Sequence, residues 1–462
     1  MILAIRSVAE GVGLALSAFA AIWISRAVGP EAFGNYAVAT VIVLLGSVVV
    51  NAGLSSAGSQ RVAANEVDAG QTWWAVTLLR FAYACIAVLI VELVLLQFHD
   101  GSPLLDYLRI AVLALLSMPL KSDWWLFATG RPGASAVVRV ATTGTLAALA
   151  VTFVRTEDDS HFLPWLVVIP WTVGALVSML LSFRSPLLSI RGLTRMPAWH
   201  SWGSLVSDGS HYLRGDASQF VVTSSDRLFL YAVATPVVVG LYDAAYKLIQ
   251  PFYAVAAIAT DTSYQKLARG FRSGKIAGPL RRYVDIMAFA TIPLGAFCAA
   301  HADWVVNAVY GADFAEAGGY LRILGWVITF GYLAAILIHP LAAWGRPRDY
   351  GNAVMSGTVV ALALNFLLIP PFLGYGAAIA TLAAKIASMF VGWIYFRRAV
   401  AYPVWTDFTV YLTISIVALA ASLVTTELAH AGEAAGIVIF ALTYMIGVGL
   451  LRSNLVRRLL GA

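Results

Sequence analysis

Charged residues are scarce in this sequence of 462 residues. Lys, Arg, Asp and Glu together make up 12% of the chain, whereas 60% of the residues are hydrophobic. A chain of this composition cannot bury its apolar surface in a water-soluble core, so the class of soluble globular proteins is excluded. The apolar runs are close to the length of a membrane-crossing helix and lack the alternation of barrel strands. We therefore predict an all-α polytopic membrane protein.

Cysteine and histidine are also rare, which excludes several kinds of site. The two cysteines, Cys85 and Cys298, fall inside apolar runs and give no disulfide framework. The seven histidines show no metal-ligand spacing. The segment from Gly270 to Ile276 is one spacer short of a phosphate-binding loop and has Ile276 where that loop requires Ser or Thr. We expect no metal, no cofactor, no ATP site and no catalytic residues, so the chain is not expected to be an enzyme.

Apolar runs of helix length fill most of the chain and leave little sequence between them. We predict about fourteen transmembrane helices, at approximately 6–27, 33–53, 75–97, 104–127, 134–154, 162–183, 210–233, 237–261, 283–301, 318–342, 352–370, 375–396, 406–426 and 434–451. The longest connections, about 184–209 and 262–282, are too short for an independent soluble domain.

Basic residues gather in alternate connections, which sets the predicted orientation. Residues such as Arg61, Arg131 and Lys275 lie on one side, and acidic residues such as Glu31 and Asp313 lie mainly on the other. Because Lys and Arg favour the cytoplasmic side, we predict that both termini are cytoplasmic in a multi-pass inner (plasma) membrane protein. The net charge of +6 then follows from membrane topology, and no nucleic-acid partner is expected.

Two sets of motifs recur in order along the chain. The pattern Pro30-x-x-x-Gly34-x-Tyr36 returns as Pro236-x-x-x-Gly240-x-Tyr242, an offset of 206 residues. Gly130-Arg131-Pro132 likewise returns as Gly345-Arg346-Pro347, an offset of 215 residues. Proline suits the start of a helix, glycine allows close approach, and tyrosine suits the membrane interface. Ordered anchors at nearly constant offset indicate an internal duplication, which is common in transporters.

The duplication predicts how the chain is divided. Six predicted helices separate the two Pro-Gly-Tyr copies, so each half begins and ends on the same side of the membrane and the repeat is parallel. We predict an N-terminal six-helix lobe with its cytoplasmic linker over 1–205, a C-terminal six-helix lobe over 206–400, and two additional helices over 401–462. A pseudo-two-fold axis along the membrane normal would relate the lobes.

The predicted helix 210–233 carries an unusual number of polar residues for a membrane span. Arg214, Asp226 and Arg227 lie on or near a polar stripe of helical spacing, which cannot face lipid. Two interpretations remain open at this point. The charges form ion pairs that fix the helix in the bundle, or at least one of the arginines lines a cavity.

Three further basic residues are candidates for a cationic cleft. Asp243 lies one helical turn before Lys247, so this pair either neutralises itself or takes part in a polar face. Lys385 stands halfway along the predicted helix 375–396 with no acidic residue within a turn, so its partner must come from another helix or a ligand. Arg26 ends the first predicted helix, where it either snorkels to the interface or faces the seam between the lobes.

Acidic residues inside the spans are candidates for coupling transport to protons or sodium ions. These candidates are Asp226, Asp243, Asp261, Glu92 and Glu10. Glu92 has no partner nearby in the sequence, and burial of such a carboxyl group would favour proton exchange. Glu10 lies four residues after Arg6, which favours a local ion pair instead.

The ordered motifs resemble a known family of membrane proteins. The segment from Ser25 to Tyr36, with its Ser-Arg-x-x-Gly-Pro-x-x-x-Gly-x-Tyr pattern, is similar to the amino-terminal signature of polysaccharide-repeat-unit flippases, of the O-antigen and exopolysaccharide type. These belong to the multidrug/oligosaccharidyl-lipid/polysaccharide exporter superfamily. Further similar segments follow in order: Asp226 to Leu230, Val239 to Lys247, Tyr310 to Phe314, Gly345 to Pro347, and Asn365 to Thr381. The resemblance covers about residues 1–400.

The resemblance implies transfer of undecaprenyl-pyrophosphate-linked oligosaccharide units from the cytoplasmic to the outer leaflet, by alternating access, for cell-surface polysaccharide or lipopolysaccharide biosynthesis. A pyrophosphate headgroup is anionic, so Arg214, Arg227, Lys247, Lys385 and Arg26 would supply its cationic cleft. Expected partners are the lipid-linked oligosaccharide, membrane lipids, and a polysaccharide polymerase with its chain-length machinery.

One alternative is a cation-coupled multidrug exporter of the same superfamily. A membrane-embedded polysaccharide polymerase or acyltransferase is the other alternative, but it predicts a large outer loop or a catalytic cluster.

Overall fold

The computed structural model describes residues 2–64, 69–97, 101–185, 188, 199–428 and 432–451. Helices account for nearly all of these residues. Contacts between Cα atoms divide the chain into two compact units, Met1–Asp243 and Ala244–Ala462. The helix α9 begins in the first unit and continues into the second.

The elements of the first unit are α1 (Ile2–Asn51), α2 (Leu54–Ala63), α3 (Ala69–Leu95), α4 (Pro103–Ala111), the 3₁₀ helix η1 (Val112–Leu120), α5 (Asp123–Ala128), α6 (Pro132–Phe153), the 3₁₀ helix η2 (Glu157–Phe162), α7 (Trp165–Phe183), α8 (Trp199–Val233) and the start of α9 (Pro236–Arg272). Those of the second unit, after the rest of α9, are α10 (Ala277–Ala300), α11 (Ala302–Tyr310), the short η4 (Ala312–Phe314), α12 (Ala317–Ala343), α13 (Pro347–Ala399), α14 (Val404–Leu423), the π-helix η5 (Val424–Leu428) and α15 (Glu433–Leu451).

The predicted set of spans is recovered once two long helices are divided at their kinks. Ten segments of the described chain are long and apolar enough to cross a membrane. Two of them contain a pair of helices each, because α1 bends at Gly29 before Pro30 and α13 bends at Leu373. The more polar helices α8 and α9 complete the fourteen predicted spans. The prediction of an all-α, multi-pass membrane protein is confirmed.

The surface of the helices explains why this fold requires a membrane. On α3, the exposed side chains include Ile86, Leu89 and Leu93, which are 54%, 59% and 52% exposed, respectively. The same helix buries Trp73 and Val76 on its inner side. A helix that is apolar on both its buried and its exposed faces is stable only when lipid covers the exposed one.

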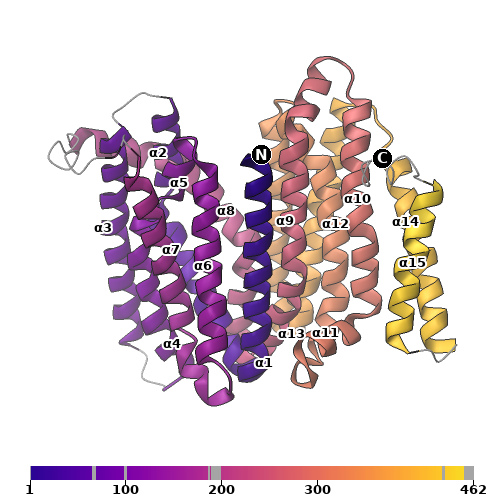
Figure 1. The fold of residues 1–462 in the computed structure, drawn as a ribbon, viewed down its shortest axis with the longest axis horizontal. Coiled ribbons are helices and arrows are strands. Elements are labelled where there is room, and N and C mark those ends of the chain that lie inside the picture. The colour runs from indigo at the N-terminus through magenta and orange to yellow at the C-terminus, as the bar shows by residue number, and fades with distance from the viewer. Residues whose placement is uncertain are drawn as a thin grey trace. The chain divides into compact units, whose positions relative to one another are not determined.

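Within the first unit, α1 packs against α6, α6 against α7, and α8 against both α1 and α2. Within the second unit, α12 packs against α10 and α13, and the last two helices pack against each other. Figure 1 shows these helices running side by side in each unit. The division into six-helix lobes at 205 and 400 stays a prediction.

The last helix pair is fixed to α10 by hydrogen bonds from polar side chains. The hydroxyl groups of Tyr411 and Tyr444 donate to the Asp285 carboxylate at 2.9 Å and to the Phe289 carbonyl oxygen at 2.8 Å. At the other end of α10, Nδ1 of buried His301 lies 2.8 Å from the Glu433 carboxylate. Helices α14 and α15 are therefore an integral part of the second unit.

The repeated Gly-Arg-Pro motif forms the same turn in both units. Gly130 and Gly345 have φ angles of 71° and 73°, a conformation that glycine adopts without steric cost. In each copy the arginine N–H donates five residues back, from Arg131 to the Leu126 carbonyl and from Arg346 to the Leu341 carbonyl. This is a Schellman turn, and the proline that follows begins the next helix. The sequence repeat thus encodes a repeated local structure.

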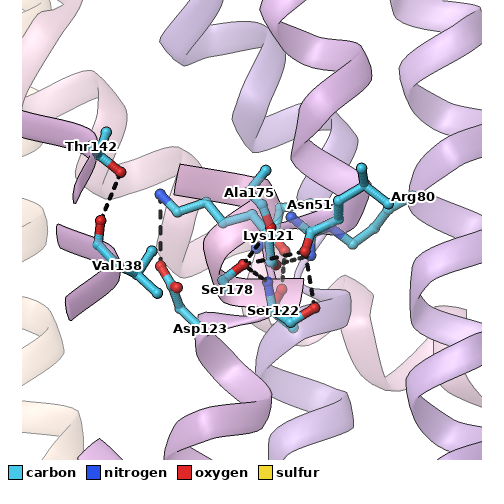
Figure 2. A network of polar contacts seen from close by, with 11 residues as sticks. Asn51, Arg80, Lys121, Ser122, Asp123, Val138, Thr142, Ala175 and Ser178 are labelled. Atoms are coloured by element: carbon cyan, nitrogen blue, oxygen red, sulfur yellow. Dashed lines mark hydrogen bonds and ion pairs between the residues drawn. The ribbon is translucent and has the colours of Figure 1, made fainter. Parts of the chain in front are cut away.

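One predicted span, 104–127, is not a continuous α-helix. It consists of α4, η1 and α5, and the backbone leaves the helical conformation at Lys121, after Pro119. Figure 2 shows how neighbouring side chains satisfy the backbone groups that this break frees. The Ser122 N–H donates to Ser178 Oγ at 2.9 Å, and the Lys121 carbonyl accepts from Arg80 at 3.0 Å. Such a break is tolerated at membrane depth only when the protein supplies these partners.

We expect Ser178→Ala to lower the free energy of unfolding by about 1–3 kcal/mol, because it leaves the buried Ser122 N–H without its acceptor. Unfolding in mixed detergent micelles would measure the effect. The control is Ser210→Ala, since the exposed Ser210 hydroxyl donates to the Ser207 carbonyl of its own helix. Equal stability of the two variants would contradict the proposed role of Ser178.

Candidate functional site

The two copies of the Pro-Gly-Tyr motif contact each other. A Cβ atom on Gly34 would overlap the Pro236 carbonyl oxygen, and one on Gly240 would overlap the Pro30 carbonyl oxygen. Each hypothetical Cβ would also lie 3.0 Å from the backbone nitrogen of the other glycine. The contact is therefore reciprocal, and it brings the backbones of α1 and α9 together as closely as glycine permits.

The tyrosines of the two motif copies are buried in the first unit. Tyr36 is 8% exposed and Tyr242 is fully buried, so both side chains are surrounded by protein. The Tyr242 hydroxyl donates to the Asp226 carboxylate at 2.6 Å. The second motif copy therefore anchors the polar end of α8.

Arg227 and Asp243 form a buried ion pair next to this contact. Arg227 Nε lies 3.0 Å from Asp243 Oδ1, and the two side chains are 9% and 3% exposed. The pair joins α8 to the first turns of α9. Its geometry agrees with the interpretation that ion pairs fix α8, because the Asp243 carboxylate balances the Arg227 charge locally.

Two further acidic residues on the polar face of α8 are also joined to neighbouring helices. Asp208 forms an ion pair with Arg61 of α2, and the Asp216 carboxylate accepts a hydrogen bond of 3.1 Å from the Asn51 amide. Arg214, between them, is exposed. These contacts explain why a helix with so many polar residues can be part of the bundle.

The second unit contains a cavity of about 420 Å³ between α9, α12 and α13. Its lining residues are Tyr253, Ala256, Thr260, Tyr264, Gly331, Tyr332, Ala335, His339, Ala342, Tyr350 and Lys385. Aromatic side chains and one lysine dominate this set. A cavity of this size with aromatic walls and a few polar groups is typical of a ligand site.

Lys385 reaches this cavity from the middle of α13. Its ammonium nitrogen lies 5.6 Å from the centre of the Tyr253 ring, a cation–π contact. Its aliphatic stem passes Gly331, where an added Cβ would lie 3.8 Å from Cδ. The described lining of the cavity contains no Asp or Glu. The arrangement therefore presents a positive charge to whatever occupies the cavity.

None of the other candidates whose side chains the structure describes is among the lining residues of this cavity. Arg26 is exposed, while Lys247 and Glu92 are partly exposed. The side chains of Glu10 and Asp261 lie outside the described residues. Arg227 is in the first unit, whereas Lys247 and Lys385 are in the second.

The aromatic walls of the cavity were not predicted from the sequence. Tyr253 and Tyr264 lie three helical turns apart on α9, and Tyr332 and His339 lie two turns apart on α12. This helical spacing was visible in the sequence. Tyrosines inside apolar helices are common, however, and only the packing of α9 on α12 shows that these faces meet.

The comparisons with known proteins agree on the family and on the fold. The family model described as "Polysaccharide biosynthesis protein" matches residues 23–318. A structure of the lipid II flippase MurJ in an inward closed conformation has a TM-score of 0.74 at 15% identity, covering 98% of this chain and 99% of that one. None of the curated proteins compared with the chain matches it.

Two transporters of the MOP superfamily are also similar in structure. An inward-facing multidrug resistance MATE family transporter has a TM-score of 0.67 at 14% identity, covering 86% of this chain and 96% of that one. A superfamily member from Pyrococcus furiosus, described as having a binding pocket of reverse polarity, has a TM-score of 0.59 at 14% identity with the same coverage. At these identities the likeness concerns the fold. The family match spans more than half of the chain and confirms the resemblance found in the motifs, so this multi-pass membrane protein belongs to the polysaccharide biosynthesis protein family.

Proposed function

We propose that this protein moves lipid-linked oligosaccharide units, carried on undecaprenyl pyrophosphate, from the cytoplasmic to the outer leaflet by alternating access. The observation that carries the proposal is the combination of a polysaccharide biosynthesis family with the fold of transporters and a flippase. A glycan precursor assembled on a lipid must cross the membrane with its polar headgroup shielded. A duplicated bundle of membrane helices is suited to that task.

The charges of the described residues support an anionic substrate. Asp226, Asp243 and Asp208 are each engaged by a partner within the first unit. Lys385, in contrast, presents its ammonium group to a cavity with no acidic residue in its described lining. An exporter of cationic drugs would instead require an acidic cavity.

The remaining elements of the proposal follow from the same substrate. Lys385 contacts an anionic group of the substrate, and Arg26, Arg214, Arg227 and Lys247 contribute positive potential. Asp226, Asp243, Asp261, Glu92 and Glu10 remain candidates for coupling to an ion gradient. The protein would lie in the inner membrane with cytoplasmic termini and would supply a polymerase and its chain-length machinery, for O-antigen, lipopolysaccharide or exopolysaccharide synthesis.

A transport assay in vesicles tests the proposal directly. The purified protein is reconstituted into vesicles with a fluorescent undecaprenyl-pyrophosphate-linked oligosaccharide. A quencher added outside the vesicles then measures how much of the fluorescent lipid has reached the opposite leaflet. We expect Lys385→Ala to lower the transport rate by about tenfold or more, because a hydrogen bond to a charged group contributes about 1.5–3 kcal/mol. Lys275→Ala, at an exposed connection, is the control for lost positive charge.

Deletion of the gene provides the complementary test in cells. We expect the lipid-linked intermediate to accumulate on the cytoplasmic leaflet. Normal glycan export combined with new sensitivity to cationic drugs would overturn the proposal in favour of the multidrug exporter.

A further inference from the structure

The cavity of the second unit has rigid aromatic walls. The Tyr264 hydroxyl on α9 donates to the Ala342 carbonyl on α12 at 3.3 Å, and the Tyr332 hydroxyl on α12 donates to the Phe252 carbonyl on α9. These hydrogen bonds tie the two helices together across the cavity. Because its hydroxyl group is occupied, the Tyr264 ring, which is 43% exposed, offers mainly apolar surface to a ligand.

The polar groups of the described lining differ in chemistry. Lys385 supplies an ammonium group, His339 an imidazole, and Thr260 a hydroxyl that lies 3.0 Å from the Tyr283 hydroxyl. The contact of Lys385 with the Tyr253 ring contributes about 0.5–2 kcal/mol. That is less than the cost of removing an ammonium group from water, so a bound anion would complete the site.

The amount of charge in the cavity limits the kind of anion. One lysine neutralises a single carboxylate, whereas a pyrophosphate diester carries two negative charges and would leave one of them uncompensated at membrane depth. The aromatic walls suit a ring with apolar faces, and the C–H faces of a pyranose are apolar. The combination of one ammonium group with several tyrosine rings therefore matches an acidic sugar.

The cavity is long enough for such a ring to enter from one end. It extends from Tyr253 to Tyr264, a rise of about 16 Å along α9. Its lining includes Ala342, next to the end of α12, and Tyr350, in the first turn of α13. The adjacent helix ends carry basic residues, among them Arg272 and Arg348, which attract an anionic ligand to this end.

We propose that this cavity, which lies wholly within the second unit, binds an acidic pyranose whose carboxylate pairs with Lys385 and whose ring lies on the tyrosine walls. The proposal deepens the proposed function, on which it rests, because it specifies a repeat unit that contains a uronic acid. It also separates two tasks. The lipid pyrophosphate binds elsewhere, and the cavity in the second unit selects the sugar.

Binding of soluble sugars tests this site without transport. The protein in lipid nanodiscs is titrated with methyl glucuronide, methyl glucoside and methyl glucoside 6-phosphate, and saturation-transfer NMR gives each dissociation constant. We expect methyl glucuronide to bind at least about tenfold more tightly than methyl glucoside, as a charge-assisted hydrogen bond implies. Equal binding of these two sugars, or tighter binding of the phosphate, would overturn the assignment.

Two variants locate the binding within the cavity. Lys385→Gln should abolish the preference for the glucuronide, whereas Lys275→Gln should preserve it. Gly331→Leu should weaken binding of every sugar by about tenfold, because its Cβ fits at 3.7 Å from Tyr253 while the rest of the side chain fills the cavity. Gly351→Leu, at an exposed position with no atom within 4 Å of the added Cβ, controls for the substitution. A Gly331→Leu protein that binds like Gly351→Leu would refute the site.

The vesicle assay distinguishes the two proposals from each other. Transport of lipid-linked units without preference for acidic sugars would leave the flippase proposal standing and overturn this one. Selective binding of methyl glucuronide without any transport would support the site and contradict the flippase proposal.

Discussion

Replacing Gly34 with alanine is expected to destabilise the protein strongly. The new Cβ would overlap the Pro236 carbonyl oxygen and lie 3.0 Å from the Gly240 nitrogen. Both obstacles are backbone atoms, which cannot rotate away as a side chain can. Overpacking costs about 1–3 kcal/mol where side chains adjust, and we expect about 3 kcal/mol or more at this contact.

The reciprocal geometry provides an internal check on this prediction. Gly240→Ala meets the Pro30 carbonyl in the same way, so it should have a similar effect. Because the two residues share one contact, the double variant should lose less than the sum of the single variants. Unfolding in mixed micelles gives the stabilities, and the vesicle assay gives transport.

A glycine outside the contact serves as the control. Gly215 lies on α8 with no heavy atom within 4 Å of an added Cβ. Alanine there should stabilise the helix by about 0.4–1 kcal/mol, since it reduces the freedom of the unfolded chain. A Gly34→Ala protein as stable as Gly215→Ala would show that α1 and α9 do not approach as described.

Breaking the ion pair of Arg227 with Asp243 is expected to have the second large effect. With side chains only 9% and 3% exposed, loss of either partner would leave the other charge buried without this ion pair. Loss of one partner from a buried pair costs about 3–5 kcal/mol, whereas replacing both by apolar residues is often neutral. We therefore expect Arg227→Met to be strongly destabilising and the combination Arg227→Met with Asp243→Leu to recover much of the stability.

An exposed arginine–aspartate pair in the same protein provides the matched control. Arg322 and Asp303 are 54% and 63% exposed and are joined by a hydrogen bond of 2.6 Å. Arg322→Met should cost about 1 kcal/mol or less, because water screens exposed pairs. Comparable losses for Arg227→Met and Arg322→Met would contradict the role of the buried pair.

Transport by the double variant would also clarify the role of Arg227 itself. Recovery of both stability and transport would indicate that Arg227 positions α8 and does not contact substrate. Recovery of stability alone would indicate that its charge is required by the substrate.

The break in the fourth predicted span shows where sequence reasoning reached its limit. The run from 104 to 127 is apolar throughout most of its length, and Pro119 with the polar segment from Lys121 to Asp123 was the local sign of an interruption. Whether proline merely kinks a helix or breaks it depends on which groups can satisfy the freed backbone. Here Ser178 and Arg80 do so from other helices, which the sequence of the span itself does not encode.

The sequence by itself determined the membrane character, the predicted spans and the repeated turns. Each of these depends on consecutive residues: an apolar run long enough for the bilayer, or a glycine and a proline at a helix boundary. The turns at Gly130 and Gly345 have the same conformation because the same three residues, Gly-Arg-Pro, stand at both helix boundaries.

Only the tertiary structure decided which charged and aromatic residues meet. Arg227 contacts Asp243 on the next helix, and Lys385 contacts Tyr253 of α9 in a cavity that tyrosines of α12 and α13 also line. Such contacts depend on how each helix is rotated and packed. A hydrophobic pattern in the sequence shows which face of a helix is buried, but it does not show which other helix that face contacts. In a membrane, lipid is as apolar as the side chains, so close packing and polar pairing set these rotations. The pairing of Lys385 with the tyrosine cavity is a consequence of that packing.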